Sequence, residues 1–169
     1  MTKPKEIEIF FLKAYEEYSD AIFRYSYYKT SNKELARDLT QETFMRSLDY
    51  LNQGKEIKSI RPFLYKTASN LIIDWYKKKK DKSVSLEELQ EEGFQIKEAS
   101  SRTPLLNAET SEVITVIKKM DESYRDAILM RYLGDLKLKE IAEIMGEKEN
   151  VISVRIHRGL KKLRELLNQ

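Results

Sequence analysis

Cysteine is absent from this chain of 169 residues, and histidine, glycine and proline are scarce. Without cysteine the chain can form neither disulfides nor a thiolate metal site. The single histidine, His157, excludes a histidine-rich metal centre and most acid–base relays. No apolar run approaches the length of a membrane-spanning helix, and the charged residues 1–8 do not resemble a signal peptide. We therefore expect a cytoplasmic protein with no cofactor, no bound metal and no segment inserted in a membrane.

The residues that are abundant indicate long, well-solvated helices. Charged residues make up 35% of the chain and apolar residues 41%, beside only five glycines and three prolines. The net charge is +5 for residues 1–80, −3 for residues 81–108 and +1 for residues 109–169. Basic residues gather at 77–80 and at 155–164. Two basic stripes separated by an acidic strip suit two nucleic-acid contacts, although each run could equally be a solvated helix face.

Apolar residues recur at helical spacing through residues 5–29, which predicts a first long amphipathic helix. Thr30-Ser31-Asn32 breaks this pattern and supplies an N-cap for a second helix, which should end near Asn52-Gln53-Gly54. Pro62 fits the first turn of a third helix that finishes in the four lysines at 77–80. The residues expected to point inward from the third helix are Leu64, Ala68, Leu71, Ile72 and Trp75.

Residues 81–104 lose the helical period and gain serine, glutamate and glutamine, so we interpret residues 81–108 as a linker. Helical pattern returns with one helix around Val113–Met120 and another around Ala127–Leu133. No strand pattern is convincing. We predict an all-α fold of two small helical domains, 1–80 and 109–169, joined by this flexible linker. Its apolar residues, which indicate that part of it docks on another surface, are Val84, Leu86, Leu89, Phe94 and Ile96.

The most informative stretch lies in the last forty residues. Leu136–Gly146 is amphipathic, has Ala142 at an inward position and is closed by a glycine. A second segment follows from Asn150, in which an apolar stripe alternates with arginine. This order is typical of a helix-turn-helix whose second helix can enter a DNA major groove about 12 Å wide. The alternative is a plain helical hairpin with a solvated arginine face.

In this second helix we expect one buried stripe and one exposed basic side. Arg155, Arg158 and Lys162 should project away from the stripe toward phosphates or guanine edges. Val151 and Val154 also lie off the stripe, where they could contact thymine methyl groups. The predicted buried stripe is Ile152, Ile156, Leu160, Leu163 and Leu167.

Three blocks of the chain, in order, resemble a known family. LKLKEIAEIMG with NVISVRIHRGLKKLREL is similar to region 4 of bacterial RNA polymerase sigma factors, which reads the −35 promoter element. ARDLTQETFMRSLDYL, residues 36–51, resembles region 2.1–2.2, which docks on the β′ clamp of the polymerase. IRPFLYKTASNLIIDWYKKKK, residues 60–80, resembles regions 2.3–2.4, which melt and read the −10 element. No region 3 domain lies between them, a layout similar to the extracytoplasmic-function (ECF) group.

The resemblance implies residues for each contact. In region 2.3–2.4, Asn70 occupies the position of the family's characteristic asparagine, and the loop 53–61 is where a flipped base would be held. Phe63 and Trp75 are either base platforms or core residues. The implied −10 contacts are Arg61, Lys66, Asn70, Asp74, Tyr76, Lys77 and Lys78. The implied −35 contacts are Lys148, Asn150, Val151, Ser153, Val154, Arg155, Arg158 and Lys162.

The implied contacts with polymerase lie on the second helix. Asp38 and Glu42 are spaced i and i+4, where like charges slightly destabilise a free helix, so a basic partner is a plausible reason for them. The alternative is that they only solubilise the helix, while Phe44 is read as core. The implied polymerase-binding residues are Asp38, Gln41, Glu42 and Arg46.

The chain also departs from the family pattern. Val151 and Val154 stand where the family usually has threonine and serine, and Ser153 stands where it often has a basic residue. Phe63 replaces the family's tryptophan but keeps an aromatic ring, and the stretch 121–124 lacks a proline that is often present. These departures affect the −35 base preference more than the placement of the helix.

We therefore expect a sigma factor that binds the β′ clamp and β flap of core RNA polymerase, recognises −35 and −10 elements and helps melt the promoter. It should perform no covalent chemistry, since no phosphate loop or nucleophile motif is present. The resemblance also implies an anti-sigma factor as a partner. The alternative is a stand-alone helix-turn-helix regulator that does not bind polymerase, which would leave the basic, aromatic helix at 60–80 unexplained.

Overall fold

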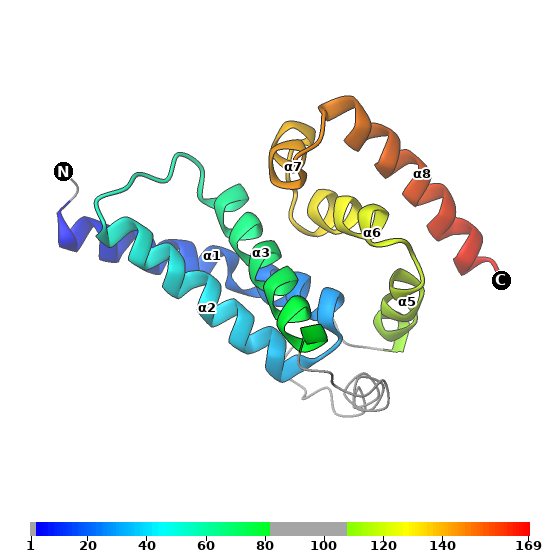
Figure 1. The fold of residues 1–169 in the computed structure, drawn as a ribbon, viewed down its shortest axis with the longest axis horizontal. Coiled ribbons are helices and arrows are strands. Elements are labelled where there is room, and N and C mark those ends of the chain that lie inside the picture. The colour runs from blue at the N-terminus through cyan, green and yellow to red at the C-terminus, as the bar shows by residue number, and fades with distance from the viewer. Residues whose placement is uncertain (1–2, 82–107) are drawn as a thin grey trace. The chain divides into compact units, whose positions relative to one another are not determined.

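The computed structural model describes residues 3–81 and 108–169, and the elements in these ranges are all helical, as the sequence predicts (Figure 1). The chain divides into two units, Met1–Leu86 and Glu87–Gln169. The predicted linker with its five apolar residues lies almost entirely outside the described residues. No helix in the described ranges is long and apolar enough to span a bilayer.

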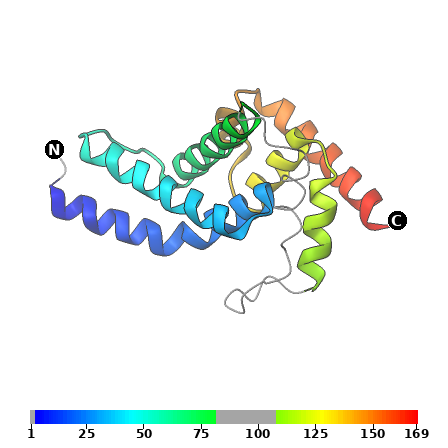
Figure 2. The same ribbon diagram turned by 60° about the horizontal axis from the view of Figure 1, so that its bottom comes forward.

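The first unit contains α1 (Pro4–Thr30), α2 (Lys33–Asn52) and α3 (Ile60–Asp81). α1 and α2 run antiparallel side by side, and α3 packs on both (Figures 1 and 2). The predicted break at 30–32 is confirmed, because Ser31 ends α1 in the left-handed conformation with φ 57°. Asn32 then caps α2, its side-chain oxygen accepting from the Leu35 N–H at 3.0 Å.

The core of the first unit contains aromatic rings as well as aliphatic side chains. Tyr25 and Tyr65 meet edge to face with their ring centroids 5.2 Å apart. Phe44, which the sequence assigned to the core, is buried and its centroid lies 5.0 Å from that of Tyr15. Burial raises the pKa of Tyr65 to about 12. The predicted inward residues Leu64, Ala68, Leu71 and Ile72 are all buried.

The described part of the second unit, residues 108–169, contains five helical segments. They are α5 (Ala108–Lys118), α6 (Glu122–Ile128), the π-helical turn η1 (Leu129–Leu133), α7 (Leu138–Met145) and α8 (Glu149–Leu167), the longest helix, which contacts α5, α6 and α7. The helix predicted at 127–133 therefore has a different form, since its second part is a π turn. The Gly134 N–H reaches the Leu129 carbonyl at 3.1 Å, a five-residue step that apolar periodicity does not reveal.

Candidate nucleic-acid interface

The helix pair α7 and α8 is held at a fixed turn. Gly146 closes α7 with φ 67°, a conformation that favours glycine, and the Glu147 N–H bonds to the Ala142 carbonyl at 3.0 Å. Ala142 and Ile152 are buried on either side of this turn, as the predicted helix-turn-helix requires. The start of α7 is fixed as well, because the Glu140 carboxylate accepts from the Lys137 N–H at 3.0 Å. The turn therefore sets the position of α8 relative to α7.

The buried stripe of α8 differs in part from the prediction. Ile152 and Ile156 are buried, and Leu160 and Leu163 are half-buried. Leu167, the last residue of α8, is 41% exposed, so its expected burial is wrong: the buried stripe ends before the helix does. Gly159 is buried and was missed, although its position three residues after Ile156 is on the stripe.

Most predicted −35 residues are on the exposed side of α8. Those exposed are Lys148, Asn150, Ser153, Val154, Arg158 and Lys162, whereas Val151 and Arg155 are half-buried. Four basic residues and Val151 follow one another at steps of three or four residues, which places them along one side of the helix. This basic stripe consists of Lys148, Val151, Arg155, Arg158 and Lys162.

The turn residue Glu147 reaches this basic stripe. Its Oε1 lies 2.7 Å from Arg155 Nη2, and the two side chains are 37% and 23% exposed. The bond is a charge-assisted hydrogen bond of the short, strong kind. Sequence reasoning gave Arg155 a role but missed Glu147, because residues eight apart on a helical pattern are not expected to meet.

On the first unit, the predicted −10 residues form a second exposed surface along α3. Lys66, Asn70, Asp74 and Lys77 are exposed at steps of four, four and three residues, so they share one face of the helix. Ile73 lies on the same face and is 41% exposed. Around Asn70 the face therefore carries two lysines, one aspartate and one isoleucine, on the side opposite to Leu64, Ala68 and Leu71.

The end of α3 carries an aromatic group. The Trp75 and Tyr76 rings meet edge to face at 4.9 Å, and Lys79 Nζ lies 4.4 Å from the centre of the Trp75 ring. Tyr76 Oη donates a hydrogen bond to the Lys29 carbonyl at 3.0 Å, which ties this end of α3 to α1. Trp75 is half-buried, so its predicted inward position is only partly correct.

Two further residues lie near the loop before α3. The Arg61 guanidinium lies 5.4 Å from the centre of the Tyr18 ring, which holds it against α1. Phe63 is half-buried and pairs with Tyr50 at 4.9 Å between ring centroids. Of the two readings of Phe63, a supporting ring of the bundle fits these contacts better than an open base platform.

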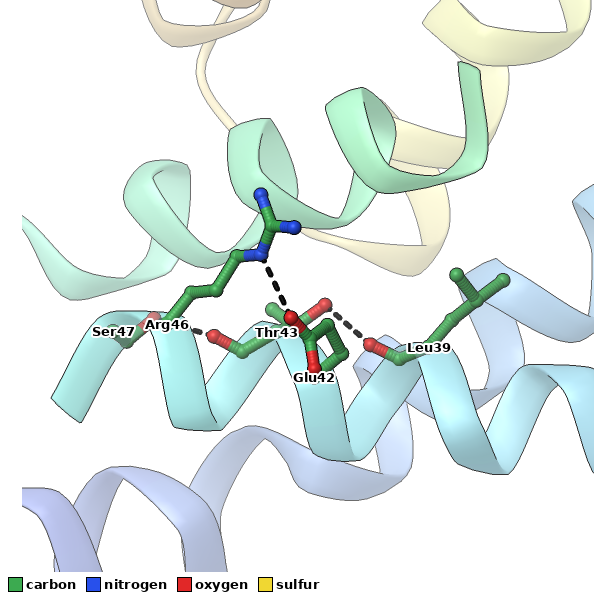
Figure 3. Close-up of polar contacts among 5 residues, drawn as sticks. All are labelled: Leu39, Glu42, Thr43, Arg46 and Ser47. Carbon is green, nitrogen blue, oxygen red and sulfur yellow. Dashed lines mark hydrogen bonds and ion pairs between the residues drawn. The ribbon is translucent and has the colours of Figure 1, made fainter. Parts of the chain in front are cut away.

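The predicted polymerase-binding residues form one patch on α2. Asp38, Gln41, Glu42 and Arg46 are all exposed. Glu42 Oε1 accepts from Arg46 Nε at 2.9 Å, as Figure 3 shows. The like-charge argument for a basic partner is therefore weaker than the sequence suggested, because the charge of Glu42 is matched within the helix.

The opposite side of α2 shows why this helix packs closely in the bundle. The hydroxyls of Thr40, Thr43 and Ser47 are buried, and each donates to the backbone carbonyl four residues earlier at 2.6 to 2.8 Å. Figure 3 shows the bonds of Thr43 and Ser47. These bonds satisfy the buried hydroxyls without any partner from another helix. The buried face is thereby fixed, and the patch from Asp38 to Arg46 faces outward.

Comparisons with known proteins match both units. The model of sigma-70 region 2 matches residues 14–82, and the model of sigma-70 region 4 matches residues 110–163. Together these two matches cover α2 and α3 in the first unit and α7 and most of α8 in the second. Among the described residues, no group of three or more His, Cys, Asp or Glu side chains could hold a metal ion.

Whole-chain relatives agree with these matches. The ECF RNA polymerase sigma factor SigM of Bacillus subtilis is 30% identical over 156 residues, covering 92% of this chain and 93% of the relative. SigW of the same organism, also an ECF RNA polymerase sigma factor, is 32% identical over 158 residues, covering 89% and 84%. The chain therefore belongs to the ECF group of the sigma-70 family of RNA polymerase sigma factors.

Solved structures show the same fold. The sigma factor RpoE of Bartonella quintana, determined with the anti-sigma factor NepR, has a TM-score of 0.71 at 19% identity, covering 94% of this chain and 96% of that one. CnrH, determined with the cytosolic domain of CnrY, has a TM-score of 0.67 at 19% identity, covering 94% and 87%.

Proposed function

We propose that the chain divides the work of a sigma factor between its two units. In this proposal residues 1–80 bind core polymerase and the −10 element, residues 81–108 are the linker and residues 109–169 read the −35 element. The observation that carries it is the presence of two separate exposed basic surfaces, on α3 and α8, together with the polar patch on α2. A stand-alone regulator would need only the helix-turn-helix, and the match of region 2 gives that alternative no support.

For the −35 element, the proposed contacts are the exposed side of α8 and its basic stripe. Lys148, Arg158 and Lys162 are suited to phosphates or guanine edges, and Val154, which is 47% exposed, is suited to a thymine methyl group. Asn150 and Ser153 supply short polar groups near the start of the helix. A helix N-terminus pointing into the groove is the usual docking of such a helix.

For the −10 element, the proposed contacts are the exposed face of α3. Asn70 presents an amide that can donate to and accept from an unstacked base, and Lys66, Lys77 and Lys78 supply charge for the backbone. The aromatic end of α3 and Arg61, both braced on α1, hold this face in place. Opening of the duplex would then be stabilised by capture of bases rather than by any covalent step.

The polar patch on α2 is the proposed docking site on core polymerase, in the cytoplasm where transcription takes place. Residues 38 to 46 offer two carboxylates, an amide and a guanidinium that suit a polar, charged partner surface. An anti-sigma factor is a further proposed partner, since the structurally similar RpoE was solved in complex with the anti-sigma factor NepR.

The experiment is retention of core polymerase on the immobilised chain without DNA, followed by run-off transcription from a promoter library. A sigma factor retains the polymerase and directs it to defined start sites. A chain that binds DNA but neither retains polymerase nor changes start sites would overturn the proposal.

A further inference from the structure

Glu147 stands out because the fold holds both its backbone and its carboxylate. Its N–H bonds to the Ala142 carbonyl at 3.0 Å, immediately after Gly146, so its backbone is fixed at the end of α7. Its carboxylate lies 2.7 Å from the Arg155 guanidinium two turns into α8. Both ends of the contact therefore belong to the helix-turn-helix itself, which Figure 1 shows as α7 and α8.

The contact lies on the basic stripe of α8. Glu147, Val151 and Arg155 are spaced by four residues each, so the carboxylate stands at the beginning of this stripe. Arg155 is the least exposed of its cations, with only 23% of its side chain exposed. A guanidinium has five N–H donors in a planar fork, and one nitrogen bonded to Glu147 leaves donors free for DNA.

We propose that Glu147 is a positioning residue that makes Arg155 selective for one base pair of the −35 element. This inference rests on the proposed −35 function of α8. The fixed carboxylate orients the planar guanidinium of Arg155 toward one place in the groove, where it can form a bidentate contact with a guanine edge. An arginine without such an anchor can follow whichever phosphate is near, which adds affinity without sequence information.

The charge of Glu147 acts in the same direction. If Arg155 leaves the pair for a phosphate, a carboxylate remains facing a negatively charged backbone, and this state is disfavoured. A correct base contact keeps the pair and avoids that penalty. The pair therefore weakens binding to random DNA while it preserves binding to the selected sequence.

The experiment uses holoenzyme reconstituted from core polymerase and the full chain. A promoter is first selected by the wild-type holoenzyme from a library randomised in the −35 element. Competition then measures binding to that promoter, to each single −35 substitution and to a random duplex, over a series of salt concentrations. The variants are Glu147→Ala, Glu147→Gln, Arg155→Ala and the double variant, with Glu143→Gln as the matched control on the exposed side of α7.

We expect Glu147→Ala to lower discrimination at the base pair read by Arg155 by about fivefold or more. Binding to random DNA should strengthen, with a slope of log K against log salt steeper by about one unit, since one more cation is free for a phosphate. Glu147→Gln, which keeps an acceptor oxygen, should retain part of the discrimination. Glu143→Gln should leave discrimination unchanged.

The double variant separates positioning from the rival explanations. If Glu147 acts through Arg155, then Glu147→Ala has no further effect on discrimination in the Arg155→Ala chain. A further loss there would overturn the proposal, because Glu147 would then read DNA itself or only support the turn. Unchanged discrimination in Glu147→Ala alone would also overturn it. If the wild-type holoenzyme selects no −35 sequence at all, the proposed function of α8 fails first, and this inference falls with it.

Discussion

The unit of α1–α3 and the unit of α5–α8 build their cores from different side chains. The first buries rings against one another, such as Tyr25 against Tyr65 at 5.2 Å, and adds buried hydroxyls that bond to their own helix. The buried apolar side chains described in the second unit are aliphatic, and α8 approaches α6 at a glycine. The first core depends on the shape of rings, and the second depends on close approach of backbones.

The proposed functional surfaces differ in a parallel way. The face of α3 around Asn70 belongs to a helix that contacts both α1 and α2 and is tied to α1 through Tyr76. The basic side of α8 belongs to a helix placed by one glycine turn, and its Arg155 is paired with Glu147. We infer that the first surface is positioned by the bundle as a whole, whereas the second is positioned by a few local contacts.

The largest effect on this comparison should come from Phe44→Ala. Phe44 is 2% exposed and packs against Tyr15 and Phe11, so we expect a loss of about 3–5 kcal/mol in the free energy of unfolding of the first unit. The only tryptophan, Trp75, lies on α3, so its fluorescence follows that unit alone during urea unfolding. A fluorescence midpoint equal to that of the wild type would contradict an aromatic core.

The next largest effect is the pH dependence that Tyr65 gives to the stability of the first unit. Burial raises its pKa from 10.0 to about 12, so between these values the folded chain keeps a proton that the unfolded chain has lost. The contribution of Tyr65 to the free energy of unfolding is fully present below pH 10. It is lost as the pH rises to 12, which lowers the free energy of unfolding by up to about 3 kcal/mol. In Tyr65→Phe the fluorescence midpoint should fall less steeply over this window.

Two comparisons sharpen the test of Tyr65. Its buried hydroxyl has no hydrogen-bond partner among residues 3–81 and 108–169, so Tyr65→Phe should not lower stability at neutral pH. Tyr132→Phe, which removes a hydroxyl from an exposed ring in the other unit, is the matched control and should leave the fluorescence curve unchanged. Equal alkaline slopes for Tyr65→Phe and the wild type would refute the role of Tyr65.

A smaller effect is expected in the second unit from Gly159→Leu. A Cβ at this position would lie 2.7 Å from Ile128 Cδ1 and 3.4 Å from Tyr124 Cβ, so a large side chain forces α8 away from α6. We expect the free energy of unfolding of the second unit to fall by about 1–3 kcal/mol. Circular dichroism should detect this change, whereas Trp75 fluorescence should not. Gly159→Ala should cost far less, since Ile128 can rotate its terminal methyl and alanine favours the helix by about 1 kcal/mol. Equal stability of the two variants would show that α8 does not pack closely on α6 at Gly159.

The smallest effect on stability should come from Arg46→Ala. Its ion pair with Glu42 is exposed on both sides, and such i,i+4 pairs contribute only about 0.3–0.5 kcal/mol. Retention of core polymerase should fall nonetheless, if the patch on α2 is the docking site. Arg37→Ala, an exposed arginine elsewhere on α2, should change neither quantity. Unchanged retention by Arg46→Ala would remove Arg46 from the interface.

Helical periodicity was sufficient for most of the fold. It placed the bounds of α1 to α3 within a few residues, the caps at Asn32 and Gly146, and four of the five expected inward residues of α3, because each depends on local pattern. Periodicity could not find the π turn at 129–133 or the exposure of Leu167, which depend on where neighbouring helices end and how closely they approach. The Glu147–Arg155 pair escaped for the same reason: its partners meet through the geometry of a turn.

The division of work between the two units is tested most directly by permanganate reactivity of −10 thymines, measured with promoter occupancy in the same holoenzyme. We expect Arg158→Ala to lower occupancy and reactivity together, because α8 is proposed to hold the −35 element. Asn70→Ala should keep occupancy and lose reactivity, because the face of α3 is proposed to capture unstacked bases. Wild-type thymine reactivity in Asn70→Ala at equal occupancy would contradict this account.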